Sequence, residues 1–270
     1  MAMPLRRRLL ALGPCVLALA ACGSSPLVPP EVVRALAPGG TLRAAINFGN
    51  PILARRDDDG QPVGVSVDLA RNLAARLGVP VQLVTFESAG KVVEAGRSGG
   101  WDLAFVAIDP LRGQDLLQTN PYVIIEGAYL VRADSPIRRN DEVDRDGIRI
   151  AVGKGSAYDL YLSRELKRAR IVHAPTSPAV TDLFVEQKLD VAAGVRQQLE
   201  ADARRLPGLR VLDGRFMVIQ QAMATPRGRE AGARYLNDYV EAMKASGFVA
   251  EALRRHGIAG AAVAPPGRPR

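Results

Sequence analysis

Cysteine is scarce in this chain of 270 residues, which contains only Cys15 and Cys22. Both lie near the N-terminus, so the part of the chain that is expected to fold contains no thiol. Structural disulfides, thiolate catalysis and thiolate zinc sites are therefore excluded for that part.

Aromatic residues and histidines are also few, at 5 % and two residues respectively. So small a share of aromatic side chains disfavours a large stacking platform for carbohydrate or bases. No dense basic run with interleaved aromatic residues occurs, so the sequence predicts no nucleic-acid partner. Asp57, Asp58 and Asp59 lack the alternating spacing and closing glutamate of a calcium loop. We therefore expect no metal site and no cofactor.

Long apolar runs are missing except at the N-terminus, where residues 9–21 follow three arginines. This run is too short to span a bilayer, and it ends in Leu-Ala-Ala-Cys22, which resembles a bacterial lipobox. Residues 1–21 are then a signal peptide, Cys22 carries a lipid anchor, and residues 22–40 form a proline-rich tether. The alternative is an ordinary secretory signal with an incidental cysteine. Either interpretation places the protein in the periplasm or cell envelope, anchored to the membrane only in the first case.

The rest of the chain has ample material for a core, because apolar residues make up 47 % of the sequence. Strands are expected at residues 41–46, 81–86 and 103–106, with helices at 65–77 and 91–97 between them. A second unit of similar length follows, with strands at 148–152, 170–173 and 191–195. Its three helices are expected to begin near residue 157, near residue 177 or 181, and near residue 197. Such alternation predicts two α/β units with parallel strands.

Two extended segments, residues 129–132 and 216–225, are expected to join these units. An amphipathic helix at 227–245 and a short helix at 248–255 follow, and residues 259–270 are expected to be a disordered tail. Two α/β units joined in this way enclose a cleft, and such clefts favour small ligands and hinge closure.

Arg112 follows the strand at 103–106 directly after the Asp109-Pro110 turn. Ligands of open α/β sheets bind at the carboxyl ends of strands, where an arginine holds a carboxylate with two parallel hydrogen bonds. Taken alone, Arg112 also fits a solvated loop arginine.

The order of several motifs favours the interpretation of Arg112 as a ligand-binding residue. In chain order they are Gly64-Val-Ser-Val-Asp68-Leu69, Trp101-Asp102-Leu103, Ile108-Asp109-Pro110-Leu111-Arg112, Asn120-Pro121-Tyr122, Ile150-Ala-Val-Gly-Lys-Gly155-Ser156 and Leu189-Asp190-Val191. From about Thr41 to Arg255 the chain resembles the family 3 solute-binding proteins of bacterial ABC importers, the amino-acid-binding type.

The resemblance implies a type II periplasmic binding fold, an α/β protein with two lobes joined by two hinge strands. Lobe 1 would comprise residues 41–131 and 217–258, and lobe 2 residues 132–216. It also implies a monomer that binds a small solute and delivers it to an ABC permease.

The resemblance also implies site residues. Arg112 inherits the role of holding the substrate carboxylate, and Ser156 lies at a helix N-terminus that favours an anion. The alternative for Ser156 is a helix cap, and for Phe48 a place in the core. The further residues that the resemblance implies are Asn47, Phe48, Asn50, Ala107, Asp109 and Ala157.

The second lobe departs from the family pattern at Val195. Amino-acid binders place an aspartate there to accept hydrogen bonds from the ligand ammonium, whereas this chain has Val195 followed by Arg196. Either another acid, such as Glu126, meets the ammonium, or the ligand has no amine and Arg196 meets a second anionic group. An inward-facing Asp109 would instead favour a cationic group.

The sequence is compatible with three functions. The first is a lipid-anchored receptor of an ABC importer, which is not an enzyme. The second is a periplasmic cyclohexadienyl dehydratase-like enzyme on the same scaffold, with Glu126 or Asp109 as general acid. The third is a sensory solute receptor, which fits less well because no segment after Cys22 is apolar enough to span a membrane.

Overall fold

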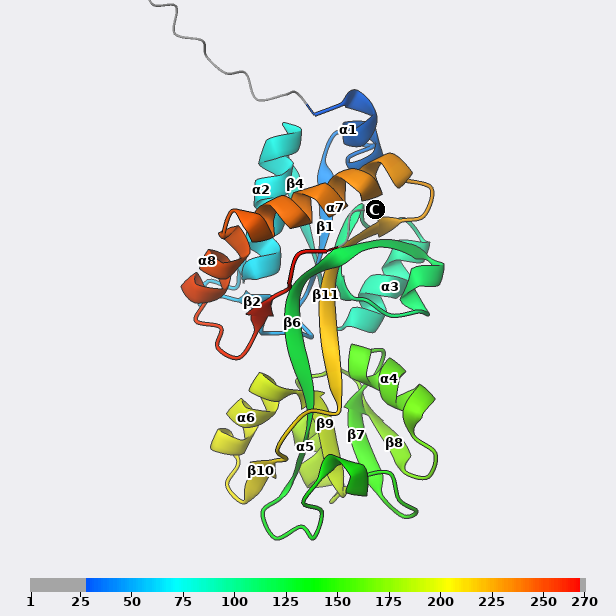
Figure 1. Cartoon of the computed structure of the whole chain (residues 1–270), viewed down its shortest axis with the longest axis vertical. Helices are drawn as coiled ribbons and strands as arrows, with labels where there is room; N and C mark the ends of the chain where they lie inside the picture. The colour runs from blue at the N-terminus through cyan, green and yellow to red at the C-terminus, as the bar shows by residue number, and fades with distance from the viewer. Residues whose placement is uncertain (1–27, 268–270) are drawn as a thin grey trace, which may run out of the picture.

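The computed structural model describes residues 28–267 and shows two α/β lobes, one above the other (Figure 1). The predicted signal peptide, Cys22 and most of the predicted tether lie outside the described residues. No helix within residues 28–267 is long and apolar enough to cross a membrane.

Lobe 1 is built on parallel strands flanked by helices, as the sequence predicts. The strands are β1 (Leu42–Asn47), β4 (Val81–Phe86) and β5 (Leu103–Ala107), and the helices are α2 (Val65–Leu77) and α3 (Ala89–Arg97). Helix α2 buries Leu69 and Leu73 at helical spacing and ends at Gly78, whose φ of +68° is left-handed. A short antiparallel hairpin of β2 (Arg55–Arg56) and β3 (Pro62–Val63) precedes α2.

Lobe 2 repeats the pattern in the lower half of the molecule (Figure 1). Its strands are β7 (Arg149–Gly153), β8 (Arg170–Ala174), β9 (Val191–Val195) and β10 (Leu209–Val211). Its helices are α4 (Ala157–Glu165), α5 (Val180–Glu186) and α6 (Arg196–Arg205), with a short 3-10 turn, η2 (Asn140–Glu142). Strand β7 pairs in parallel with both β8 and β9, as crossover helices require.

Two long antiparallel strands, β6 (Leu116–Arg132) and β11 (Met217–Pro226), run through both lobes (Figure 1). In lobe 1 β11 pairs with β5, and in lobe 2 β6 pairs with β9. The sheets expected for the two lobes are therefore linked into one, in the order β4-β1-β5-β11-β6-β9-β7-β8. This is the type II periplasmic binding fold that the sequence predicts.

The predicted tether is wrong for its last part, because Pro30–Leu36 form helix α1. Proline at the first helical position fits the helix start. Val32 and Leu36 are buried, and the carbonyl of Ala35 accepts a hydrogen bond from Arg229, just before helix α7 (Glu230–Ala245). Apolar burial against α7 orders a segment whose proline content favoured an extended tether.

The predicted disordered tail is also wrong up to Gly267. After α8 (Phe248–Arg255), strand β12 (Ala262–Val263) pairs with β6 at Val123 and Ile124. Beyond it, the amide of Ala264 donates to the carbonyl of Tyr122, and Lys244 donates to the carbonyl of Pro265. Backbone pairing at the edge of β6 holds this segment in place. Its small side chains give no pattern from which a strand could be predicted.

Truncation after Gly260 should therefore lower stability by roughly 2 kcal/mol, because strand pairing and the burial of Ala264 are lost together. Urea denaturation of the full-length and truncated chains measures this difference. Equal midpoints and slopes would show that the segment adds nothing to the fold.

Candidate ligand-binding cleft

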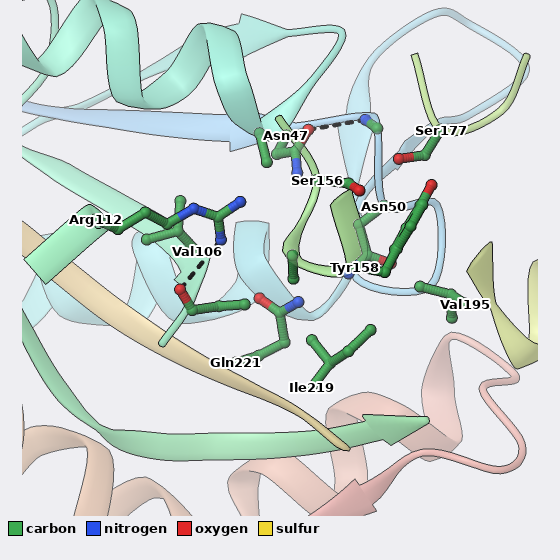
Figure 2. A pocket seen from close by; sticks show the side chains of 14 residues that line it. Asn47, Asn50, Val106, Arg112, Ser156, Tyr158, Ser177, Val195, Ile219 and Gln221 are labelled. Carbon is green, nitrogen blue, oxygen red and sulfur yellow. Dashed lines mark hydrogen bonds between the residues drawn. The ribbon is translucent and has the colours of Figure 1, made fainter. Parts of the chain in front are cut away.

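A cavity lies between the lobes, where the carboxyl ends of β1 and β5 face the start of α4 (Figure 2). Its volume is about 30 Å³. Its lining consists of Asn47, Gly49, Asn50, Ala89, Val106, Ala107, Arg112, Ser156, Ala157, Tyr158, Ser177, Val195, Ile219 and Gln221.

Among the described residues that line the cavity, only Arg112 is charged. It begins the 3-10 turn η1 (Arg112–Gln114) after β5 and is only 3 % exposed. Its guanidinium donates to the carbonyls of Ala107 at 3.1 Å and of Gly155, in lobe 2, at 2.9 Å. Its Nε–H is buried and has no acceptor among the described residues. Burial lowers the pKa of Arg112 to about 10, so the side chain remains a cation at neutral pH.

The start of α4 supplies the opposite wall. Ser156 caps this helix, because its hydroxyl oxygen accepts a hydrogen bond from the amide of Asp159 at 3.0 Å. Ser156 therefore acts as the helix cap. The amides just before the helix are paired as well, because that of Gly155 donates to the Asp159 carboxylate at 2.8 Å and that of Ser156 to the carbonyl of Gly153 at 3.1 Å. Ala157 and Tyr158 also line the cavity, and burial raises the pKa of the Tyr158 hydroxyl to about 12, so it is neutral.

The loop after β1 places Asn47 and Asn50 in the lining but not Phe48. The side chain of Asn47 accepts from the amide of Gly49 at 2.9 Å, and the buried Oδ1 of Asn50 has no donor among the described residues. Phe48 packs in the lobe 1 core, with the guanidinium of Arg56 4.3 Å from its ring centroid. The structure therefore supports the core interpretation of Phe48.

Asp109 does not face the cavity, contrary to the expectation for this turn. One carboxylate oxygen accepts from the amide of Leu111 at 2.9 Å, and the other accepts from Arg164 in lobe 2 at 2.9 Å. Ala107 does line the cavity, and its carbonyl accepts from Arg112 and from Gln118.

Glu126 and Arg196 bind each other rather than facing the cavity. Arg196 donates to Glu126 at 3.1 Å, and Arg215 donates to the other oxygen of Glu126 at 2.7 Å. The hydrogen bond from Arg215 is the largest of several effects that lower the pKa of Glu126. Neither residue lines the cavity, whereas Val195 does. No carboxylate lines it among the described residues.

The two histidines are paired with carboxylates outside the cavity lining. His173 lies 2.8 Å from Asp159, and His256 lies 2.8 Å from Asp68. Within residues 28–267 no group of three or more His, Cys, Asp or Glu side chains is placed to hold a metal ion.

Several lining residues have little sequence signal. Gln221 and Ile219 lie on β11, where Gln221 is a buried polar residue in an extended run that was expected only to join the lobes. Ser177 was expected only as a possible helix start. Val106 and Ala89 are small or apolar residues that resemble core positions. Side chains of this kind are recognised only once the two lobes are placed against each other.

Residues 42–258 match the model of the bacterial extracellular solute-binding proteins, family 3. The chain belongs to this family. The match covers both lobes and both long strands, which confirms the resemblance of the motifs.

Two proteins that are similar to this chain differ in what they do. One is the cyclohexadienyl dehydratase of Pseudomonas aeruginosa, 24 % identical over 221 residues that cover 79 % of this chain and 81 % of the enzyme. Another is the solute receptor for L-cysteine of Neisseria gonorrhoeae, with a TM-score of 0.73 and 23 % identity over 83 % of this chain and 92 % of the receptor.

A third similar structure is an ancestral amino-acid-binding protein described as a precursor of cyclohexadienyl dehydratase. Its TM-score is 0.70, at 22 % identity over 83 % of this chain and 98 % of that protein. At these identities the structural likeness supports the fold, and family membership supports binding of a small solute.

Proposed function

We propose that this protein is a solute receptor that binds a small carboxylate without an amino group in the cleft between its lobes. The observation that carries the proposal is the charge of the lining, which contains Arg112 and no carboxylate among the described residues. Arg112 anchors the carboxylate, and the positive end of helix α4, which begins after Ser156, stabilises the same anion from the other lobe.

The missing acid disfavours an ordinary amino acid. An α-ammonium group would be desolvated near the Arg112 cation and would find no negative partner in the lining. The acids proposed for that role are occupied, Glu126 by Arg196 and Arg215, and Asp109 by Arg164. Apolar Val195 and Ile219 instead suit a hydrocarbon or keto group.

Within this proposal the protein is the receptor of an ABC importer and is held at the membrane by lipid on Cys22. Family membership and the lipobox-like sequence support this role. Mass spectrometry of the protein purified from a bacterial envelope tests the anchor. A diacylglyceryl adduct on an N-terminal Cys22 is expected, whereas an unmodified cysteine would contradict it.

A dehydratase is the second candidate because of the similarity to the enzyme from Pseudomonas aeruginosa. It is disfavoured because the proposed general acids, Glu126 and Asp109, are both paired with arginines and absent from the lining. Incubation with prephenate or arogenate distinguishes the two candidates. Formation of an aromatic product would show that the protein is a dehydratase and contradict the receptor proposal.

A thermal-shift and calorimetric screen tests the proposal with matched pairs of ligands. The pairs are pyruvate and alanine, succinate and aspartate, and glutarate and glutamate, in which the amino group is replaced by a keto oxygen in pyruvate and by hydrogen in the other two acids. We expect the amine-free member to bind more tightly in each pair that binds. Tighter binding of the amino acid would contradict the proposal.

Val195→Asp should reverse this preference, because it introduces a carboxylate at a lining position that is 9 % exposed. We expect at least a tenfold shift in relative affinity towards the amino acid, since a hydrogen bond to a charged group is worth roughly 1.5–3 kcal/mol. Val195→Asn has the same shape without the charge and serves as the control. Equal behaviour of the two variants would show that charge at residue 195 does not select the ligand.

A further inference from the structure

One ion pair joins the two lobes at the turn that carries Arg112. Arg164, in the third turn of α4, donates to Asp109 at 2.9 Å. The Asp109 side chain is 4 % exposed and that of Arg164 is 38 % exposed. This pair combines a buried acid in lobe 1 with a half-exposed base in lobe 2.

Asp109 also shapes the turn before Arg112. Its second carboxylate oxygen accepts from the amide of Leu111 at 2.9 Å, and its carbonyl accepts from the amide of Gly113 at 2.9 Å. Arg112 lies between these two residues and donates to the carbonyl of Gly155 at 2.9 Å, immediately before α4. Both ends of α4 therefore contact the same turn of lobe 1.

A pair of glycines allows the lobes to approach this closely. A Cβ added to Gly155 would lie 2.8 Å from the Cα of Gly90, in α3 of lobe 1. Gly155 also has a φ of +71°, which favours glycine. The Arg112–Gly155 contact and the Arg164–Asp109 pair thus depend on the lobes being closed.

We propose that Arg164 is a positioning residue that holds the lobes closed through Asp109 and thereby orients Arg112 at the cleft. An interaction made only in the closed form shifts the equilibrium towards that form by its own free energy. A half-exposed pair is weak, so the expected shift in the ratio of closed to open molecules is about two- to fivefold. The inference rests on the proposed function only in taking the closed cleft as the binding form.

The distance between the lobes can be measured without ligand, so this test is independent of the proposed function. The full chain with Cys15 and Cys22 replaced by serine contains no other thiol. Cysteines introduced at the exposed Ser98 of lobe 1 and Arg168 of lobe 2 accept spin labels, and double electron–electron resonance reports the distribution of distances.

We expect Arg164→Ala and Arg164→Glu to move the distribution towards the open form and Arg164→Lys to restore most of the closed form. Asp109→Asn, which retains an oxygen for the amide of Leu111, should behave like Arg164→Ala, and the double variant should add little to either. Arg204→Ala, at an exposed position on α6, is the matched control. Circular dichroism establishes that each variant is folded.

Two outcomes would overturn the proposal. One is a wild-type distribution that is already open, and the other is a closed distribution that persists in Arg164→Glu and Asp109→Asn. Because Asp109→Asn removes the charge of the same pair from lobe 1, the test does not depend on whether an Arg164 variant folds.

Discussion

Arg112→Ala is expected to weaken binding of the amine-free carboxylates on the order of 100-fold or more. Removing one partner of a buried, hydrogen-bonded charge pair costs roughly 2–5 kcal/mol, because the other charge stays desolvated and unpaired. Arg112 is 3 % exposed and has a buried Nε–H without an acceptor among the described residues. Calorimetric titration with pyruvate, succinate and glutarate measures the loss.

Two further variants separate the role of Arg112 in binding from its role in structure. Arg112→Lys retains the charge but not the planar fork, so we expect an intermediate affinity. Arg71→Ala, at an exposed position on α2, should bind as the wild type does. Unchanged affinity in a folded Arg112→Ala variant would show that Arg112 does not hold the carboxylate.

Asp102→Asn is expected to destabilise lobe 1 by about 3–5 kcal/mol, the usual cost of breaking a buried ion pair. The Asp102 side chain is 1 % exposed. It accepts hydrogen bonds from Arg43 at two side-chain nitrogens, both at 2.8 Å, and from Arg229 at 2.8 Å. The pair thus joins β1 and β5 to the start of α7. Urea denaturation measures the change.

Asp115→Asn is the matched control, because Asp115 pairs with Arg97 at a more exposed site. We expect a change within about 0.5 kcal/mol, as for most exposed pairs. Similar losses in the two variants would show that burial of Asp102 does not determine the effect.

The contribution of Asp102 should depend on pH. Burial alone would raise the pKa of Asp102, but hydrogen bonds from Arg43 and Arg229 outweigh it and lower the pKa. A carboxyl whose pKa is lowered by folding stabilises the fold above its unfolded pKa of about 3.9, and this stabilisation is lost as pH falls through the lower folded value. The difference in unfolding free energy between wild type and Asp102→Asn should therefore be constant near neutral pH and shrink below about pH 4.

Much of the fold follows from local sequence patterns. Apolar spacing with a terminal glycine predicts α2, and the alternation of strands and helices predicts both lobes. Helix α1 and strand β12 were mispredicted because their order depends on α7 and β6, which lie far away in sequence. Proline and small residues do not by themselves distinguish an ordered segment from a disordered one.

The residues of the site were likewise predictable only where the local sequence determines their position. Arg112 and Ser156 were expected in the cleft from the turn and the helix start that carry them, and both line it. Glu126 and Arg196 were expected there too, but they are 70 residues apart in sequence and pair with each other. The sequence shows which charges are available, and only the tertiary structure shows which of them are already paired.

A crystal structure with the tightest-binding amine-free carboxylate of the screen would show which group holds the ligand. We expect a carboxylate oxygen within about 3 Å of the Arg112 guanidinium, with the rest of the ligand against Val195 and Ile219. A ligand whose carboxylate lies away from Arg112, or an amino acid whose ammonium is held in the cleft by a side-chain carboxylate, would contradict it.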